Sequence, residues 1–462
     1  MRVLYLACPL AVFAFTREAQ ASLQYSPVVE TTNGSYKGVY LPQYDQDLFL
    51  DPESLTTDWT GKRPATKYAF TEDSLYLNVI RPHGFENASL PVLVWIHGGG
   101  FKQGGTMDKW YNLTFIVQNS VNINKPMIAV SIAYPAERAL NLGLKDQRLA
   151  LNWNQENIAG FGGDPRKVTI YGQSAGAESV GYHLRAFKGR DDGLFRAPIM
   201  QSGPVIPQGP LNLTASYQSR YEGVVAEAGC SHADHKLNCL RALPFAVLNN
   251  VLNTSAYNTG WEPTIDSDFV ARYPSEQVDD GSFVRVPIIA GTTTDEGSTQ
   301  SPKPVNTTEK LRSWMNTTSS YQLALPSSLI DALLALYPNI TTFGIPSSVE
   351  LGGNVTLPQP YGAAFRQSAA YFGDQPATAS WVKGVAHFSD VAFVFNDLKR
   401  QGYDVNPFAV GNLTHKYLEL SYLMAGSWAR ELGGMPLGLW VRSPGGRSIR
   451  LIGRAIWSSM RT

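Results

Sequence analysis

The hydrophobic residues of this chain gather into short, nearly continuous apolar runs, which are separated by longer segments of mixed character. Five runs are rich in β-branched residues: Pro91–His97, Met127–Ala133, Val168–Tyr171, Ala197–Gln201 and Val286–Ala290. Strands that are covered on both faces have this pattern, because neither face needs polar residues. Between two of the runs, Lys145–Asn157 carries apolar residues at helical spacing. This alternation predicts an α/β fold with a mostly parallel central sheet flanked by helices.

The run that ends at Tyr171 leads directly into a Gly-x-Ser-x-Gly turn, and the helix-forming stretch Ala175–Leu184 follows. A strand, a sharp turn and a helix in this order form a nucleophile elbow, which lifts the Ser174 hydroxyl off the sheet. Gly172 and Gly176 suit such a turn, because a side chain at either position would crowd the backbone beside the serine. The motif alone leaves open a glycine-rich turn without a catalytic role.

A serine hydroxyl becomes an effective nucleophile only beside a base that a carboxylate orients. In α/β-hydrolases the acid and then the histidine follow the serine along the chain. Asp295 and Glu296 come just after the last apolar run, which is where the carboxyl end of a strand would present an acid. His387 is the best-placed base, since His415 follows a glycosylation sequon in a loop and His183 lies within the elbow helix as a structural histidine.

A glycine-rich loop follows the first apolar run, in the sequence His97-Gly98-Gly99-Gly100-Phe101. Backbone amides in such a loop can bind the oxyanion of a tetrahedral intermediate, and the amide of Ala175 would complete the oxyanion hole. A flexible linker would not be expected to follow a buried strand in this way.

Composition narrows the class of protein further. The chain has 462 residues, of which 44% are hydrophobic, and its formal net charge is zero. This balance gives no reason to expect binding to nucleic acid or to an anionic membrane surface. Neither Cys-x-x-Cys nor His-Glu-x-x-His occurs, so we expect no metal and no other cofactor. Beyond the N-terminus, no apolar stretch is long enough to span a bilayer.

The N-terminus has the features of a secretory signal peptide, although a short buried helix is the alternative. An apolar run from Val3 to Phe15 follows Met1-Arg2, and Ala19-Gln20-Ala21 would place cleavage before Ser22. Secretion also agrees with ten Asn-x-Ser/Thr sequons, at Asn33, Asn87, Asn112, Asn212, Asn253, Asn306, Asn316, Asn339, Asn354 and Asn412. We therefore expect an extracellular glycoprotein. Once Cys8 is removed with the signal, Cys230 and Cys239 form a disulfide more readily than a metal site.

These motifs, taken together and in order, resemble the type-B carboxylesterases, the cholinesterase-like group of α/β-hydrolases, and in particular their fungal secreted esterase and lipase members. Further matching stretches are Glu72–Val79, Asn141–Leu151, Phe161–Pro165, Met200–Gly203, Cys230–Arg241 and Gly384–His387. The resemblance implies hydrolysis of a small-molecule or lipid carboxylic ester. It assigns Ser174 as nucleophile, Glu296 rather than Asp295 as acid, and His387 as base.

The same resemblance makes Gly99, Gly100 and Ala175 the oxyanion donors. It implies a Cys230–Cys239 disulfide, and it also implies a structural ion pair between Arg148 and Asp164. We expect residues 1–21 to be the signal peptide and 22–428 the hydrolase domain, with cap-like material at about 300–380. Residues 429–462 form a basic tail, read either as poorly ordered or as a frame- or splice-altered end.

The sequence departs from the family pattern at several points. Gln173 replaces the glutamate that many members carry beside the serine, which we interpret as tuning of the histidine. Residues 371–381 lack the apolar strand that normally precedes the catalytic histidine, so we expect that strand to be missing or altered. Two hypotheses follow: an active secreted ester hydrolase, or a non-catalytic relative that serves as a binding protein or is a truncated product.

Overall fold

The computed structural model describes the following residues: 26–50, 75–106, 108–134, 141–206, 212–213, 217–257, 262–293, 296, 307–317, 324–336, 387–403, 406–408, 414–432, 440–442 and 448–450. The expected signal peptide and Asp295 lie outside these residues, and so does the segment in which we expected a missing strand.

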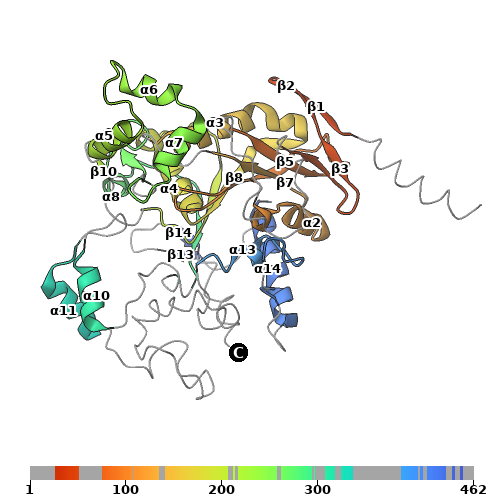
Figure 1. The fold of residues 1–462 in the computed structure, drawn as a ribbon. Helices are drawn as coiled ribbons and strands as arrows, with labels where there is room; N and C mark the ends of the chain where they lie inside the picture. Colours follow the sequence, from red (N-terminus) through yellow and green to blue (C-terminus); the bar gives the residue numbers. More distant parts are fainter. Residues whose placement is uncertain are drawn as a thin grey trace, which may run out of the picture.

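An eight-stranded sheet forms the centre of the described fold (Figure 1). Its strands, in spatial order, are β12 (Ile289–Gly291), β9 (Ala197–Gln201), β8 (Gly163–Gln173), β6 (Leu90–Ile96), β7 (Ile128–Ile132), β5 (Leu77–Pro82), β4 (Gln46–Phe49) and β3 (Val39–Leu41). The pairs from β12 to β7 are all parallel, whereas β5, β4 and β3 join as antiparallel strands. The predicted α/β fold with a mainly parallel sheet is therefore confirmed.

Apolar side chains on both faces of the sheet explain why its strands read as continuous hydrophobic runs. Val92, Val94 and Ile96 of β6 pack into one core, while Leu93 and Trp95 pack into the other. The first core is closed by α3 (Leu142–Asn157) and α4 (Ala175–Gly189). The second is closed by α2 (Thr114–Asn122), α13 (Val391–Val394) and α14 (Thr414–Leu432), which lie together in Figure 1.

The remaining elements surround this centre. They are β1 (Val28–Thr31), β2 (Gly34–Lys37), η2 (Lys109–Tyr111), η3 (Ile158–Phe161), β10 (Asn212–Leu213), α5 (Gln218–Glu227), α6 (Lys236–Ala242), α7 (Phe245–Leu252), β11 (Thr264–Ile265), α8 (Pro274–Asp279), α10 (Thr308–Met315), α11 (Ser327–Leu336), β13 (Trp440–Arg442) and β14 (Ser448–Arg450). Within the expected cap, α10 and α11 are joined by an ion pair between Arg312 and Asp331 at 2.6 Å. Within the expected tail, β13 and β14 form an antiparallel ladder. Among the described helices, none combines the length and the apolarity that a bilayer span needs.

Long-range contacts bear out one structural expectation and correct another. Cys230 forms a disulfide with Cys239 of α6. The Arg148–Asp164 ion pair, in contrast, is absent from the described contacts. Arg148 instead pairs with Asp192, while Asp164 contacts the cations of its own strand, Arg166 and Lys167, both at 3.2 Å. Proximity along the strand therefore decides the partners of Asp164, and its pKa falls to about 2 beside Arg166.

The sequons differ in their accessibility. Asn33, Asn87, Asn253 and Asn316 lie on the surface. Asn112 is only 4% exposed, and its side-chain amide donates to Gln401 Oε1 at 2.7 Å. A glycan at Asn112 would have to displace this hydrogen bond in the folded chain, and glycosylation stays a prediction for all of the sequons.

Candidate active site

The turn between β8 and α4 has the geometry of a nucleophile elbow. Ser174 adopts φ 58° and ψ −129°, an uncommon backbone conformation for a residue with a side chain. Its amide donates to the carbonyl of Gln201 on β9 at 2.8 Å. A Cβ on Gly172 would lie 2.3 Å from the carbonyl of Gly176, and one on Gly176 would lie 2.1 Å from the carbonyl oxygen of Ile96. Close backbone approach on both sides therefore requires the two glycines.

Three predicted residues from distant parts of the chain meet at this turn. His387 Nε2 lies 2.8 Å from Ser174 Oγ, and His387 Nδ1 lies 2.5 Å from Glu296 Oε2. Ser174 lies between β8 and α4, Glu296 follows β12, and His387 precedes α13. Because β8 and β12 are parallel strands of one sheet, their carboxyl ends share one edge, which brings the serine and the acid together.

Glu296 is held as a carboxylate by its hydrogen bonds. Its Oε1 accepts from Ser202 Oγ at 2.5 Å, from the Thr293 amide at 2.7 Å and from Thr293 Oγ1 at 2.6 Å. Burial opposes ionisation of this group, but the hydrogen bonds from His387, Ser202 and Thr293 outweigh it and lower the pKa of Glu296 to about 2. The acid therefore stays charged at all moderate pH values, as an orienting partner for an imidazole must.

Ser202 is a site residue that the sequence analysis did not identify. It follows directly after β9, the strand between β8 and β12. Parallel strands end at one edge, so a polar residue at this position had to lie between the serine and the acid. That adjacency could have revealed Ser202, but the strand order becomes known only from the fold.

The glycine-rich loop lies against the elbow. A Cβ on Gly98 would lie 2.6 Å from the carbonyl oxygen of Gln173 and 3.0 Å from the Ser174 side chain. Gly99 and Gly100 have φ values of 114° and 63°, which favour glycine. The predicted oxyanion donors Gly99, Gly100 and Ala175 are thus brought to the same end of the sheet as Ser174.

His97 supports this loop from below. Its ring stacks on Tyr134 with centroids 4.2 Å apart, and its Nδ1 lies 2.8 Å from the carbonyl oxygen of Gly98. Burial lowers the pKa of His97 to about 4, so the ring is neutral near pH 7 and Nδ1 donates its hydrogen to that carbonyl. The other two candidate bases lie elsewhere: His183 is buried and bonded to Gln147, while His415 lies on the surface of α14.

A buried polar chain lies behind His387. Asp390 Oδ2 accepts from Gln201 Nε2 at 2.7 Å, and Gln201 in turn bonds the hydroxyl of Tyr171. Burial, together with the charge of Glu296, raises the pKa of Asp390 to about 6. The carboxyl of Glu296 is thus the ionised acid of the site, whereas Asp390 holds a proton more readily.

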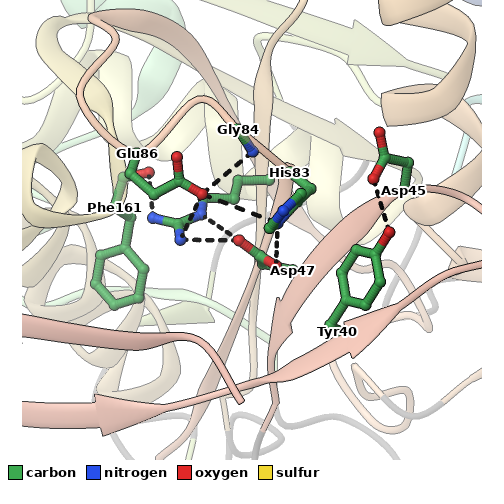
Figure 2. A network of polar contacts seen from close by, with 8 residues as sticks. Tyr40, Asp45, Asp47, His83, Gly84, Glu86 and Phe161 are labelled. Carbon is green, nitrogen blue, oxygen red and sulfur yellow. Dashed lines mark hydrogen bonds and ion pairs between the residues drawn. The ribbon is translucent and has the colours of Figure 1, made fainter. Parts of the chain in front are cut away.

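One other cluster of ligand-type side chains deserves a test as a metal site. Asp47, His83 and Glu86 each offer one ligand atom within a 4.8 Å span (Figure 2). The guanidinium of Arg81 lies among them, with Nε and Nη2 at 2.9 and 2.8 Å from Asp47 Oδ2 and Nη2 at 3.4 Å from Glu86 Oε1. Arg81 already supplies the positive charge that these carboxylates need, so the cluster fits an internal ion-pair network rather than a cation site.

Comparison with known proteins gives consistent matches. A profile described as "Carboxylesterase family" matches residues 17–328. Secreted lipase 1 of Botryotinia fuckeliana is 35% identical over 71% of this chain and 65% of its own length. Lipase 4 of Diutina rugosa is 37% identical over 66% of this chain and 58% of its own. The chain thus spans about six tenths of the length of these curated relatives.

Two further comparisons concern the fold and the activity. The crystal structure of Aspergillus niger EstA matches with a TM-score of 0.65 at 23% identity, covering 89% of this chain and 90% of that one. A protein named "Inactive carboxylesterase-like protein VdtD", from Byssochlamys spectabilis, is 28% identical over 90% of this chain and 78% of its own length. The match to EstA supports the fold alone. The match to VdtD shows that the relatives of this chain include a protein named as inactive.

Proposed function

Because this chain belongs to the carboxylesterase family, we propose that it hydrolyses carboxylic esters through an acyl intermediate on Ser174. The observation that carries the proposal is the continuous contact from Glu296 through His387 to Ser174, at 2.5 and 2.8 Å. An ionised acid beside Nδ1 favours the tautomer in which Nδ1 carries the hydrogen. The lone pair of Nε2 then faces the serine hydroxyl.

In the first half of the reaction, Ser174 Oγ attacks the ester carbonyl carbon and its proton passes to His387 Nε2. The negative charge that develops on the carbonyl oxygen is stabilised by the amides of Gly99, Gly100 and Ala175. As the tetrahedral intermediate collapses, the bond between the carbonyl carbon and the alcohol oxygen breaks, and the imidazolium gives its proton to that leaving oxygen. Glu296 stabilises the imidazolium throughout, without taking the proton itself.

In the second half, water attacks the acyl-serine while His387 Nε2 accepts one of its protons. Collapse of this second tetrahedral intermediate breaks the bond to Ser174 Oγ, which regains the proton from His387 and releases the carboxylic acid. The substrate class is a small-molecule or lipid carboxylic ester. The names of the relatives, which include lipases, support that class for this chain.

The proposal includes secretion to the extracellular space after removal of residues 1–21. Two relatives are named as secreted, Secreted lipase 1 of Botryotinia fuckeliana and Secreted triacylglycerol lipase LIP1 of Gibberella zeae. N-terminal sequencing of protein recovered from a fungal culture medium tests this proposal. We expect the mature chain to begin at Ser22, and retention of the full-length chain in the cells would contradict it.

Hydrolysis of p-nitrophenyl butyrate tests the activity. Ser174→Ala should lower kcat by at least about 10⁴-fold, since nucleophile removal in a triad costs this much or more. Ser120→Ala is the matched control, because Ser120 is a buried serine of α2 whose hydroxyl donates to the Val117 carbonyl of the same helix. A fluorophosphonate probe should label the wild-type chain at Ser174, and label found elsewhere would contradict the assignment.

A second candidate is a non-catalytic carboxylesterase-like protein. It is favoured by the match over 90% of this chain to a relative whose name says that it is inactive. The same experiment separates the two candidates. A folded sample that neither turns over ester nor reacts with the probe would support this second function and overturn the first.

A further inference from the structure

One ion pair joins the glycine-rich loop to a neighbouring segment of the chain. Lys102 Nζ lies 3.5 Å from Glu262 Oε1, and the two side chains are only 26% and 14% exposed. Glu262 stands on a fixed support, because two residues later Thr264 exchanges hydrogen bonds with Asn141 at 2.8 and 2.9 Å. The ion pair of Lys102 therefore connects the loop with three consecutive glycines, which is conformationally permissive, to a segment that hydrogen bonds hold in place.

The backbone of Lys102 controls the direction of a proposed oxyanion donor. The amides of Lys102 and Gln103 both donate to the carbonyl oxygen of Gly99, each at 3.2 Å. The carbonyl of Gly99 and the amide of Gly100 belong to the same planar trans peptide, so they point in opposite directions. Holding the Gly99 carbonyl toward Lys102 therefore turns the Gly100 amide hydrogen the other way.

The glycine-rich loop needs a restraining contact, because part of its backbone is flexible and part of it is strained. Gly99 and Gly100 can adopt several other backbone conformations at little cost. Phe101 has φ 57°, which is unfavourable for a bulky residue. Packing of the buried Phe101 ring near Tyr182 opposes release on one side, and the Lys102–Glu262 ion pair opposes it on the other.

We propose that Lys102 is a positioning residue, whose ion pair with Glu262 fixes the Gly99–Gly100 peptide in the orientation that presents the Gly100 amide to the oxyanion. The inference rests on the proposed ester hydrolysis and extends it to a residue that does not touch the substrate. Its effect should appear in the transition state rather than in substrate binding, because the oxyanion charge develops only there.

The other charged groups around Glu262 reinforce the need for the lysine. Glu178 on α4 and Arg220 on α5 also interact with Glu262 electrostatically. Burial raises the pKa of Glu262, and the charge of Lys102 acts against this rise. Glu178, which is protonated more readily than an exposed carboxyl, adds repulsion whenever it ionises. Without the lysine, the Glu262 carboxyl would lose its main reason to stay charged.

The test compares Lys102→Met and Glu262→Gln with the matched control Lys145→Met. Lys145 is a suitable control because it binds the same part of the chain, through Asp266 at 3.4 Å and Asp268 at 3.0 Å, but from α3 and not from the glycine-rich loop. In Lys102→Met and in Glu262→Gln, kcat should fall between about 10- and 100-fold while KM stays within about 2-fold of wild type. This loss is expected for an oxyanion donor displaced by a fraction of 1 Å.

Two further measurements separate positioning from general loss of structure. Affinity for a trifluoromethyl ketone, which places an oxyanion in the hole, should fall in parallel with kcat, while Lys145→Met keeps both values. Hydrogen exchange of the peptide spanning residues 98–104 should accelerate in Lys102→Met and in Glu262→Gln only. A double variant in which the two residues are swapped, Lys102→Glu with Glu262→Lys, should recover part of the kcat that the single variants lose.

The exchange measurement keeps the proposal open to refutation even if the chain hydrolyses no ester. In that case the proposed function fails, and unchanged exchange in the 98–104 peptide would refute the tether separately. In an active enzyme, a loss confined to KM would overturn the inference, as would an equal loss in the Lys145→Met control.

Discussion

Gly176→Ala is the sharpest perturbation of the elbow. The added Cβ would lie 2.1 Å from the carbonyl oxygen of Ile96 and 2.7 Å from that of His97. Both contacts are to the backbone at the end of β6, where no side chain can rotate away. Restoring ordinary van der Waals contact, at 3.4 Å or more, requires a displacement of more than about 1 Å between the elbow and the glycine-rich loop.

That displacement separates the nucleophile from the oxyanion donors. A shift of about 1 Å at a reacting centre costs about 100-fold in rate, equivalent to roughly 2.7 kcal/mol of transition-state stabilisation. Overpacking of this kind also lowers the free energy of unfolding by about 1–3 kcal/mol. Gly176→Ala should therefore lower kcat for p-nitrophenyl butyrate by about 100-fold and lower the melting temperature.

Gly426→Ala provides the control for this comparison. Gly426 lies inside α14, and a Cβ there would meet its nearest neighbours at 3.6 and 3.7 Å, which is ordinary van der Waals contact. Alanine in a helix interior should then raise the free energy of unfolding by roughly 0.5–1 kcal/mol and leave kcat unchanged. Wild-type kcat and melting temperature in Gly176→Ala would refute the reasoning, because the crowding at Ile96 would then have no consequence.

Two further predictions concern charges near Ser174. Ser202→Ala removes the 2.5 Å hydrogen bond from the Ser202 hydroxyl to Glu296. A hydrogen bond to a charged group contributes roughly 1.5 kcal/mol, so kcat should fall by about 10-fold with KM unchanged. An effect on KM alone would contradict this role of Ser202. Burial and the charge of Glu262 raise the pKa of Glu178 to about 7 from 4.5. The folded chain therefore binds a proton at Glu178 more tightly than the unfolded chain does. As a result, the free energy of unfolding falls by up to about 3 kcal/mol as the pH rises from 4.5 to 7. Glu178→Gln should therefore raise the melting temperature at pH 8 relative to wild type but not at pH 4, and an equal effect at both pH values would contradict the shift.

Local sequence features predicted the strands and helices of the centre well, but their limits less well. Ala197–Gln201 coincides with β9, whereas the predicted strand Val286–Ala290 forms a ladder only from Ile289 to Gly291. Pro287 lies within the predicted range and has no amide hydrogen to donate to a neighbouring strand. The strand before the elbow is also longer than the predicted run Val168–Tyr171, because β8 already begins at Gly163. Its pairing with β6 then shifts between Gly163 and Val168, which accommodates the turn residues as an irregularity in the strand.

The Arg148 partner shows why electrostatic contacts resist prediction from sequence. Arg148 and Asp192 are far apart in the chain, and their contact depends on how α3 and the end of α4 pack. The cations that pair with Asp164 lie only two and three residues away, so these ion pairs do not depend on the packing of distant segments. A charged pair reflects local geometry in the folded state, so similarity to other proteins is a weaker guide here than it is for the elbow.

The sequence by itself determined the local geometry around Ser174. The order of strand, Gly-x-Ser-x-Gly and helix requires the elbow at Ser174, because only glycine tolerates the backbone contacts on both of its sides. What the tertiary structure decided is which distant groups reach that serine. His387 is 213 residues away along the chain, and Ser202 reaches Glu296 only because of the strand order. The pairing of Lys102 with Glu262 likewise depends on how the loops pack. Long-range placement follows from the burial of many side chains at once, and no single segment of the sequence carries it.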